Sequence, residues 1–316
     1  MLSCFMVIRN GIDLGYPFIE AISSALPLCD ELLVSDGNSN DGTYEALIKF
    51  FNSTNKVKIF RDEWDNASLK GSAIRNALNK VRNRCTGDYI LEVDANEIVP
   101  PEDYEFIKTL PLIYPDKEIF GFPYYQIMGS EILFTEEFRF RLAKNKRSIK
   151  VLWDGYTLGH HLDLKSLAEK GTIRRVINRF LTSVLEERVS GGFVPEQYIY
   201  LPTPIFRYYS IFPENFFKKM TTKLFFQPDK DYTTLLSQES DQELKSIWSN
   251  YIENNNYSKF WEEIYNFHIK KIKEGVKLNK EFIENRKVPS TSQPQIIRGQ
   301  FGKRKYELPT DIVDYN

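Results

Sequence analysis

Acidic residues follow two of the apolar segments that this sequence predicts to be strands. Asp36 and Asp41 lie in VSDGNSNDGT at 34–43, and Asp94 and Glu97 lie in YILEVDANEIV at 89–99. If strands alternate with helices, their carboxyl ends line the crevice in which open α/β sheets bind ligands. Carboxylates at such a place suit the ribose of a nucleotide and a divalent cation with oxygen ligands. The spacing therefore predicts a nucleotide and metal site at one edge of a sheet.

The first acidic segment also fits a tight turn between a strand and a helix. Gly37 and Gly42 would then supply positive φ, and Asp41 would cap the helix that follows. A calcium loop of the EF-hand kind is excluded, because its sixth position needs Gly where Asp41 stands and its twelfth needs an acid where Leu47 stands. Asp36, at the end of the strand itself, remains as the ligand candidate.

The second acidic segment ends an apolar strand with Asp94, Asn96 and Glu97. Clustered polar groups there are costly unless they face water, a cation or a ligand. The residues themselves leave two interpretations open, a solvated exit from the strand and a site for Mg²⁺ or Mn²⁺. A third segment, KGSAIRNAL at 70–78, places Arg75 one turn into a helix, where it suits either a diphosphate or an ordinary surface position.

Apolar segments alternate with helical patterns through the first hundred residues. The pattern predicts strands at 3–9, 31–35, 57–61 and 89–93, and helices at 17–26, 43–51 and 69–81. Such alternation is typical of βαβ units with a mostly parallel sheet.

The pattern changes after Pro100 and Pro101. FRFRL at 138–142 predicts an antiparallel pair, 137–143 with 149–155, whose arginines face water and whose apolar side chains face the core. Helical patterns follow at 164–190 and beyond 213, and residues from about 287 have a loop-like composition. We expect a nucleotide-binding and catalytic domain at 1–212 with a helical insertion at 164–190. A helical region at 213–316 then ends in an extended tail.

The composition excludes several other classes of protein. Hydrophobic residues make up 42% and charged residues 27%, which indicates a packed core rather than disorder. Lys and Arg number 42 against 43 Asp and Glu, so we expect no stable nucleic-acid partner. Three scattered cysteines predict neither disulfides nor zinc. We expect no signal peptide, because no basic stretch precedes the first apolar run, and no spanning helix, because no apolar run reaches 18 residues. We expect a cytoplasmic protein, with peripheral membrane contact left open.

Four motifs, in this order, resemble those of the family 2 glycosyltransferases of the GT-A fold. They are VIRNG at 7–11, DGNSNDGT at 36–43, GSAIRN at 71–76 and DANE at 94–97. The resemblance covers residues 3–100 and continues more weakly through RLAKN and WDGYTLGHH to 161. It implies an α/β fold of the GT-A (Rossmann-like) type, with a mixed, mostly parallel sheet flanked by helices and a mostly helical C-terminal region.

The resemblance also implies roles for individual residues. The implied nucleotide-binding residues are Arg9, Asn10, Asp36, Arg75 and Asp94. The implied ligands of an Mn²⁺ or Mg²⁺ ion are Asp94, Asn96, Glu97 and His160. Asn96 stands where the family usually has the metal-binding aspartate.

The implied activity is transfer of a hexosyl or related sugar from a nucleotide-sugar, with a UDP-sugar favoured, to a hydroxyl of a glycan, a lipid-linked or another acceptor. The resemblance favours inversion at the anomeric carbon. The metal would neutralise the diphosphate, and a carboxylate would take the hydroxyl proton. Glu137, Asp154 and Asp163 are the candidates for this base. Asp154 is preferred because it follows an apolar strand, between Trp153 and Gly155.

Two other functions compete with this one. A nucleotidyltransferase would need a Gly-rich, Arg-containing loop after the first strand, and the sequence RNGI at 9–12 does not supply one. A non-catalytic protein that binds a nucleotide-sugar or a glycan is kept open by Asn96 in the metal motif. Nucleotide binding without turnover would distinguish this second alternative from the enzyme.

Overall fold

Strands and helices alternate at the start of the computed structural model, which describes residues 1–64, 72–152, 155, 157–161, 197–221, 238–275 and 286–310. The first strands are β1 (Leu2–Ile8), β2 (Glu31–Asp36), β3 (Val57–Arg61) and β4 (Tyr89–Glu92). The helices between them are α1 (Gly11–Leu14), α2 (Phe18–Ala25), α3 (Thr43–Phe51) and α4 (Ser72–Arg82). The predicted alternation is confirmed, with small shifts at the ends of elements.

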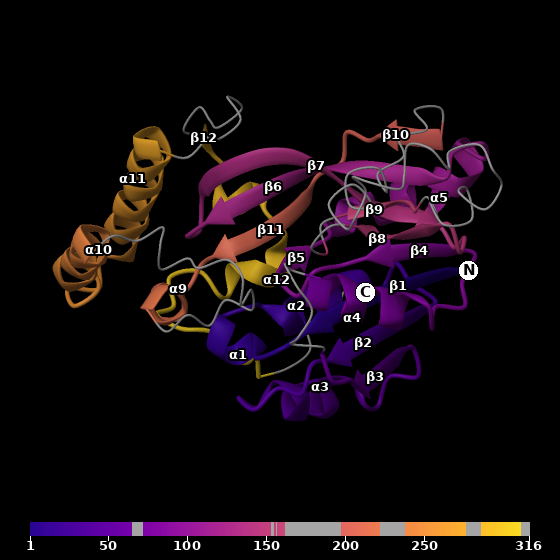
Figure 1. Ribbon diagram of the computed structural model, residues 1–316, viewed down its shortest axis with the longest axis horizontal. Coiled ribbons are helices and arrows are strands. Elements are labelled where there is room, and N and C mark those ends of the chain that lie inside the picture. The colour runs from indigo at the N-terminus through magenta and orange to yellow at the C-terminus, as the bar shows by residue number, and fades with distance from the viewer. Residues whose placement is uncertain are drawn as a thin grey trace, which may run out of the picture.

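Within the described residues, one sheet contains ten strands in the order β3-β2-β1-β4-β7-β6-β11-β5, with β10 beside β6 and β12 beside β7. The later strands are β5 (Glu97–Ile98), β6 (Ile119–Met128), β7 (Ile132–Lys144), β10 (Tyr198–Tyr200), β11 (Ile205–Ser210) and β12 (Arg286–Lys287). β1 to β4 pair in parallel, as do β11 and β6, whereas β7 runs antiparallel to β4 and β6. The sheet is therefore mixed and mostly parallel, as predicted (Figure 1).

The predicted pairing of 137–143 with 149–155 is wrong. β7 has β4 on one side and β6 on the other, so β8 (Ile149–Leu152) pairs instead with β9 (Thr157–His160) in a separate sheet. The predicted orientation of the β7 side chains is also wrong, because Arg139 and Arg141 are only 5% and 1% exposed while Phe138 is 47% exposed. Alternation alone places charged residues in water, but Arg141 turns inward because carboxylates from β4 and the segment after it lie there.

Both faces of the sheet are covered. Cys4, Met6 and Ile8 of β1 belong to a hydrophobic cluster with α2, α3 and α5 (Tyr104–Ile113), which follows the 3-10 turn η1 (Pro101–Asp103). Phe5, between them, belongs to a second cluster with α4, β8 and β9. This division follows from strand geometry, in which successive side chains point to opposite faces.

Three helices after the sheet form a third hydrophobic cluster with Met128 and Ile132, where β6 ends and β7 begins. They are α9 (Pro213–Thr221), α10 (Gln238–Tyr251) and α11 (Tyr257–Gly275), and Figure 1 shows α10 and α11 at one end of the molecule, away from β1 to β4. Residues 286–310 then return to the first cluster through η3 (Ser290–Ser292) and α12 (Gln295–Arg298). The predicted insertion at 164–190 lies outside the described residues, and the boundary at 212/213 stays a prediction.

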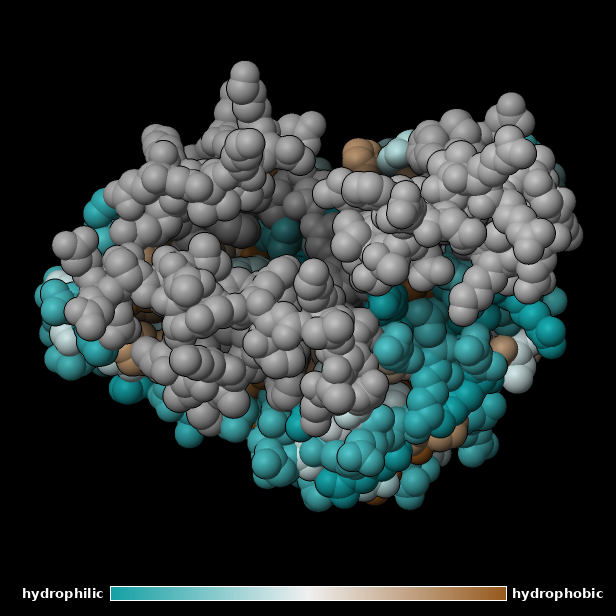
Figure 2. Space-filling view, in the orientation of Figure 1, coloured by the Kyte–Doolittle hydropathy of each residue, from teal (hydrophilic) through white to brown (hydrophobic). Residues whose placement is uncertain are grey.

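The open edge of the sheet at β3 carries charged residues. Lys58 and Arg61 are exposed there, and Figure 2 shows the surface over β3 and α3 as largely hydrophilic. Charges on an edge strand oppose pairing with another chain. Across the described ranges, no helix combines the length and apolar character needed to cross a membrane.

Candidate active site

The carboxyl ends of β1, β2 and β4 lie at the same edge of the sheet. The register pairs Ile8 with Asp36 and Phe5 with Glu92, so the segments that follow these strands emerge side by side. The predicted nucleotide-binding residues at this edge are Arg9, Asn10, Asp36 and Asp94. The parallel topology therefore brings together residues that are up to 85 positions apart in the sequence, from Arg9 to Asp94.

Asp36 holds the turn that follows β2. It is fully buried, and its carboxylate accepts hydrogen bonds from the Ser39 N–H at 3.0 Å and from the Ser39 hydroxyl at 2.5 Å. Burial raises the pKa of Asp36, while the Ser39 bonds and the Arg61 guanidinium, 3.8 Å away, oppose the rise. Asp36 therefore shapes the loop that a nucleotide at this edge would contact.

Asn10 joins this loop to the end of β1. Its backbone is in the left-handed region with φ of 51°, which asparagine tolerates better than most residues. The Asn10 N–H donates to the Ser39 hydroxyl oxygen at 2.8 Å, and the Asn10 side-chain oxygen accepts from the Asn40 N–H at 3.1 Å. Loops from two neighbouring strands are thereby held in one arrangement.

The turn residues of this loop depart in part from expectation. Gly42 has φ of 92°, as predicted, but Gly37 does not, and Asn38 takes the other left-handed position with φ of 57°. Gly37 instead allows the Trp64 ring to pack against the backbone, since a Cβ at this position would lie 2.5 Å from the ring. The predicted cap is wrong by one residue, because Gly42 is the N-cap of α3. Asp41, just before it, accepts a hydrogen bond at 3.0 Å from the Thr43 N–H at the start of the helix.

Arg141 of β7 binds three carboxylates around the end of β4. Its Nη1 donates to Glu92 Oε1 at 2.6 Å, and its Nη2 donates to Asp94 Oδ2 at 3.0 Å and to Glu97. Glu92 and Glu97 are completely buried, whereas the Asp94 side chain is 27% exposed. Burial raises the pKa of both glutamates, and Arg141 opposes this. Arg141 thus compensates buried negative charge and orients the one carboxylate that reaches solvent.

Asn96 is tied to the neighbouring strand β11. Its Nδ2 donates to the Tyr208 carbonyl at 3.1 Å, and its Oδ1 accepts from Arg207 Nε at 3.4 Å. Arg207 Nη1 also donates to Gln126 Oε1 at 3.1 Å, and its guanidinium carbon lies 5.8 Å from the Tyr124 ring centre. The amide of Asn96 therefore orients an arginine.

The predicted metal ligands are engaged in other bonds. Asp94 Oδ2 accepts from Arg141, and Asn96 Oδ1 accepts from Arg207. Both oxygens of Glu97 are used, one by Arg141 and the other, at 3.0 Å, by the Asp94 N–H. Nowhere in the described ranges do three or more His, Cys, Asp or Glu residues gather in a way that could hold a metal ion. The side chains in this arrangement do not fit a divalent cation.

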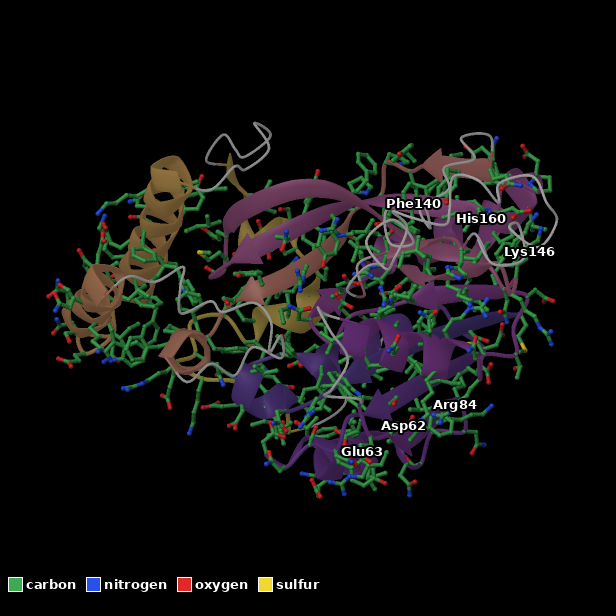
Figure 3. All side chains as sticks on the ribbon, viewed as in Figure 1. Asp62, Glu63, Arg84, Phe140, Lys146 and His160 are labelled. Carbon is green, nitrogen blue, oxygen red and sulfur yellow. The ribbon has the colours of Figure 1, made fainter. Side chains whose placement is uncertain are left out.

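His160 lies at the opposite end of the sheet. Its Nε2 is 3.4 Å from Glu118 Oε2, and the Glu118 carbonyl accepts from the N–H of Lys144. Lys144 pairs with Tyr89, the first residue of β4, and Figure 3 shows His160 at this end. Burial lowers the pKa of His160, and Glu118 opposes the shift. The structure therefore does not bring His160 to Asp94.

Three further predicted residues, Arg75, Glu137 and Asp154, are described to different extents. Arg75 lies in the first turn of α4 and is partly buried, and α4 is anchored to β8 because Asn79 bonds the Val151 N–H and carbonyl at 3.0 and 2.9 Å. Glu137 is placed by its backbone, opposite Tyr124 in the pairing of β7 with β6. The side chain of Glu137 and the whole of Asp154 lie outside what the structure describes.

Two arginines at the site, Arg141 and Arg207, were not predicted from the sequence. A signal for Arg141 existed, because three acids around the end of one buried strand need a cation close by. FRFRL supplies that cation only if its arginines point inward, which is the reverse of the usual alternation. Arg207, in IFRYYS at 205–210, carries no comparable signal.

The sequence profile of Glycosyl transferase family 2 matches residues 3–160. The chain belongs to this family. The match confirms the resemblance drawn from the four motifs, and the observed mixed sheet with helices on both faces confirms the predicted GT-A fold. The comparison with curated protein sequences finds no match.

Several solved structures are similar to this family 2 chain at low identity. TarS of S. aureus is 13% identical, with a TM-score of 0.39 over 69% of this chain and 38% of TarS. The mannosyltransferase PcManGT of Pyrobaculum calidifontis, solved with GDP-Man and Mn²⁺, is 19% identical over 38% of this chain and 34% of its own, with a TM-score of 0.30. The glucosyl-3-phosphoglycerate synthase of Mycobacterium tuberculosis, solved with Mn²⁺ and UDP, is 19% identical over 40% of this chain and 44% of its own, with a TM-score of 0.29. This chain thus spans less than half the length of each.

Proposed function

We propose that this family 2 protein transfers a sugar from a nucleotide-sugar donor to a hydroxyl of an acceptor, with inversion at the anomeric carbon. The observation that carries the proposal is the shared edge of the sheet. There the loops after β1 and β2 are locked together, and Asp94 presents a partly exposed carboxylate oriented by Arg141. A carboxylate at this edge suits the hydroxyls of a ribose. Family membership supports the class of reaction.

In the proposed reaction, the acceptor oxygen attacks the anomeric carbon while the bond from that carbon to the diphosphate oxygen breaks. The nucleoside diphosphate leaves with the electron pair of that bond. The hydroxyl proton passes to a carboxylate of the protein, for which Asp154 and Glu137 are the proposed candidates. Direct displacement from the face opposite the leaving group gives inversion. The chain's contribution is to hold donor and acceptor in line and to accept this proton.

The donor nucleotide and the cofactor stay predictions. A UDP-sugar is the proposed donor, and a glycan, a lipid-linked molecule or another hydroxyl compound is the proposed acceptor. The predicted Mn²⁺ or Mg²⁺ is at odds with the bonds that Asp94, Asn96 and Glu97 make, so no step is assigned to a metal. The cytoplasmic location also stays a prediction.

Asp94→Asn tests the role of the shared edge. We expect this variant to lose about 100-fold or more in donor turnover, because a charged contact to the donor is lost. The measurement is nucleoside diphosphate release from UDP-, GDP-, CDP-, ADP- and dTDP-sugars, in EDTA and again in Mn²⁺. Asp88→Asn is the matched control, since Asp88 is exposed just before β4 at the other end of that strand. Unchanged turnover in Asp94→Asn would overturn the proposal.

Asp154→Asn and Glu137→Gln test the identity of the base. The variant that removes the base should lower kcat by roughly 10²- to 10⁴-fold while the affinity for the donor nucleotide stays the same. If both variants kept the kcat of the wild-type protein, the base would be another residue. If the wild-type protein bound a nucleotide-sugar but did not turn it over with any acceptor, the result would favour the non-catalytic alternative.

A further inference from the structure

Arg141 and Arg207 both act on Asp94 at the candidate site, and their hydrogen-bond partners differ. Arg141 is completely buried and is committed to three carboxylates. Arg207 is partly exposed and donates to the neutral amide oxygens of Asn96 and Gln126. Within the described part of the chain, no carboxylate oxygen lies within 4.0 Å of the Arg207 guanidinium. The charge of Arg141 is therefore paired inside the protein. Burial opposes the charge of Arg207, but Tyr124, Asp94 and Glu97 outweigh it and raise the pKa of Arg207, so its partly exposed guanidinium stays charged and can contact an anion.

Arg207 is held in place at the edge where the donor is proposed to bind. Its guanidinium carbon lies 5.8 Å and 5.9 Å from the ring centres of Tyr124 and Tyr209. Tyr16, between α1 and α2, is close enough to Arg207 and Asp94 for both to act on its pKa, which burial raises to about 12. A guanidinium fixed by two amides and two rings loses little freedom on binding a ligand.

Asn96 binds Arg207 without neutralising its charge. An aspartate in its place would form an ion pair with Arg207 and cancel the positive charge toward solvent. The asparagine accepts the same hydrogen bond through Oδ1 but brings no charge, and its Nδ2 is anchored on the Tyr208 carbonyl. The departure from the family's metal-binding aspartate thus coincides with an oriented arginine that has no carboxylate within 4.0 Å among the described residues, with Asp94 and Glu97 acting on it from farther away.

We propose that Arg207, oriented by Asn96, neutralises the diphosphate of the donor in place of a divalent cation. The inference rests on the proposed function and concerns the same site. Guanidinium groups bind two phosphate oxygens at once through paired N–H donors. Such a contact also compensates the negative charge that grows on the leaving diphosphate as the bond to the sugar breaks. Donor binding should then require no metal.

The first experiment measures binding of UDP, GDP, ADP, CDP and dTDP by calorimetry, in EDTA and again in Mn²⁺. The expected result is one nucleoside diphosphate whose Kd is the same within about twofold in both conditions. Binding that appears only with Mn²⁺ would overturn this inference and leave the proposed function standing. No binding of any of the five in either condition would overturn both.

Arg207→Gln tests the residue itself. This variant should lower the affinity for the nucleoside diphosphate on the order of 10- to 100-fold in EDTA, because a charge-assisted hydrogen bond is lost. The affinity for the matching nucleoside should stay the same. Arg207→Lys keeps the charge and should recover part of the affinity. Lys146→Gln, which removes a positive charge at the far end of the sheet, is the control. Equal losses for nucleoside and diphosphate in Arg207→Gln would mean a structural role and overturn the assignment.

Asn96→Asp gives the reciprocal test. The new carboxylate should pair with Arg207, so affinity for the nucleoside diphosphate in EDTA should fall by a similar factor. Addition of Mn²⁺ should restore some affinity, because the variant has one more acidic ligand beside Asp94. Unchanged binding in EDTA would show that the charge of Arg207 does not reach the diphosphate.

Discussion

Arg141 is the residue at which the buried charges of the candidate site meet. It lies in β7, and its three carboxylate partners lie 44 to 49 positions earlier, in β4, β5 and the turn between them. Desolvation of such a group costs several kcal/mol per ion, so the arrangement contributes little net stability compared with an apolar core. Removal of Arg141 alone should be strongly destabilising, because it leaves the three acids without a counter-charge.

We expect Arg141→Met to lower the free energy of unfolding by about 3 to 5 kcal/mol at pH 7. The deficit should depend on pH with a definite sign. Without Arg141, the folded pKa values of Glu92 and Glu97 rise further above their unfolded values. Above about pH 4.5, the folded variant then keeps protons on these two glutamates, whereas the unfolded chain releases them. The loss of stability is therefore small below about pH 4.5 and grows as the pH rises. Urea denaturation at pH 4 to 8 measures it.

Lys270→Met is the matched control for this prediction. Lys270 pairs with Glu243 at 3.1 Å on the exposed surface of α11, with side chains 53% and 35% exposed. Exposed ion pairs contribute about 0 to 1 kcal/mol, so the control should change stability little at any pH. If Arg141→Met behaved like Lys270→Met, the buried cluster would not carry the charge assigned to it.

At the scale of elements, Glu31 joins the starts of four strands at the end of the sheet opposite the site. Its Oε1 accepts from the Ser3 hydroxyl at 2.7 Å and from the N–H and hydroxyl of Thr86 at 2.7 and 2.8 Å. Its Oε2 accepts from Lys58 Nζ at 2.7 Å. Burial acts to raise the pKa of Glu31, but these bonds outweigh it and lower the pKa to about 2. One carboxylate thus links β1, β2, β3 and the turn before β4.

Glu31→Gln should cost about 2 to 3 kcal/mol of stability at pH 7, because a carboxylate with a depressed pKa stabilises the fold above its unfolded value. That stabilisation is lost as the pH falls from about 4.5 toward 2, so the difference between wild type and variant should shrink over this range. Denaturant titrations at pH 7, 5, 4 and 3 measure the trend. Nucleotide affinity should not change, because the site lies at the other end of the strands.

Glu105→Gln is the comparison for Glu31. Glu105 is an exposed partner of Lys108 within α5 and should show no such trend. A difference for Glu31→Gln that stayed constant from pH 7 to pH 3 would contradict the depressed pKa.

At the scale of the whole molecule, residues 286–310 pack against both α2 and α9. The Tyr306 hydroxyl lies 3.1 Å from Glu20 Oε2, and its ring centre is 5.6 Å from that of Phe18. Its N–H donates to Asn215 Oδ1 at 2.8 Å. Burial raises the pKa of Glu20, and the bonds from Gln300 and Tyr306 oppose the rise. The last described segment is therefore part of the core.

Tyr306→Ala should lower the free energy of unfolding by about 3 to 5 kcal/mol, because it removes a buried ring and leaves a cavity. Tyr306→Phe keeps the ring and removes one hydrogen bond, so it should cost about 1 kcal/mol. Chemical denaturation of both variants separates packing from hydrogen bonding. If Tyr306→Ala cost no more than Tyr306→Phe, the segment would not be packed as described.

Local sequence patterns were enough to predict the strands and helices of the first hundred residues and the family. The strands from β1 to β4, the helices between them and the DGNSNDGT and DANE segments at strand ends all follow from periodicity and from turn chemistry over a few residues. The predicted edge with Asn10, Asp36 and Asp94 also followed, because parallel strands end at one edge whatever lies beyond them.

Only the tertiary structure decided what the site residues contact. The direction of Arg141 depends on acids more than 40 positions away, the partner of Asn96 is Arg207, 111 positions later, and His160 lies with Glu118 at the other end of the sheet. The pairing of β7 with β4 and β6 overrode the local alternation of FRFRL for the same reason. A sequence window encodes periodicity. The energy of a buried charge is set by distant groups that the fold brings within a few ångström, and no local pattern encodes them.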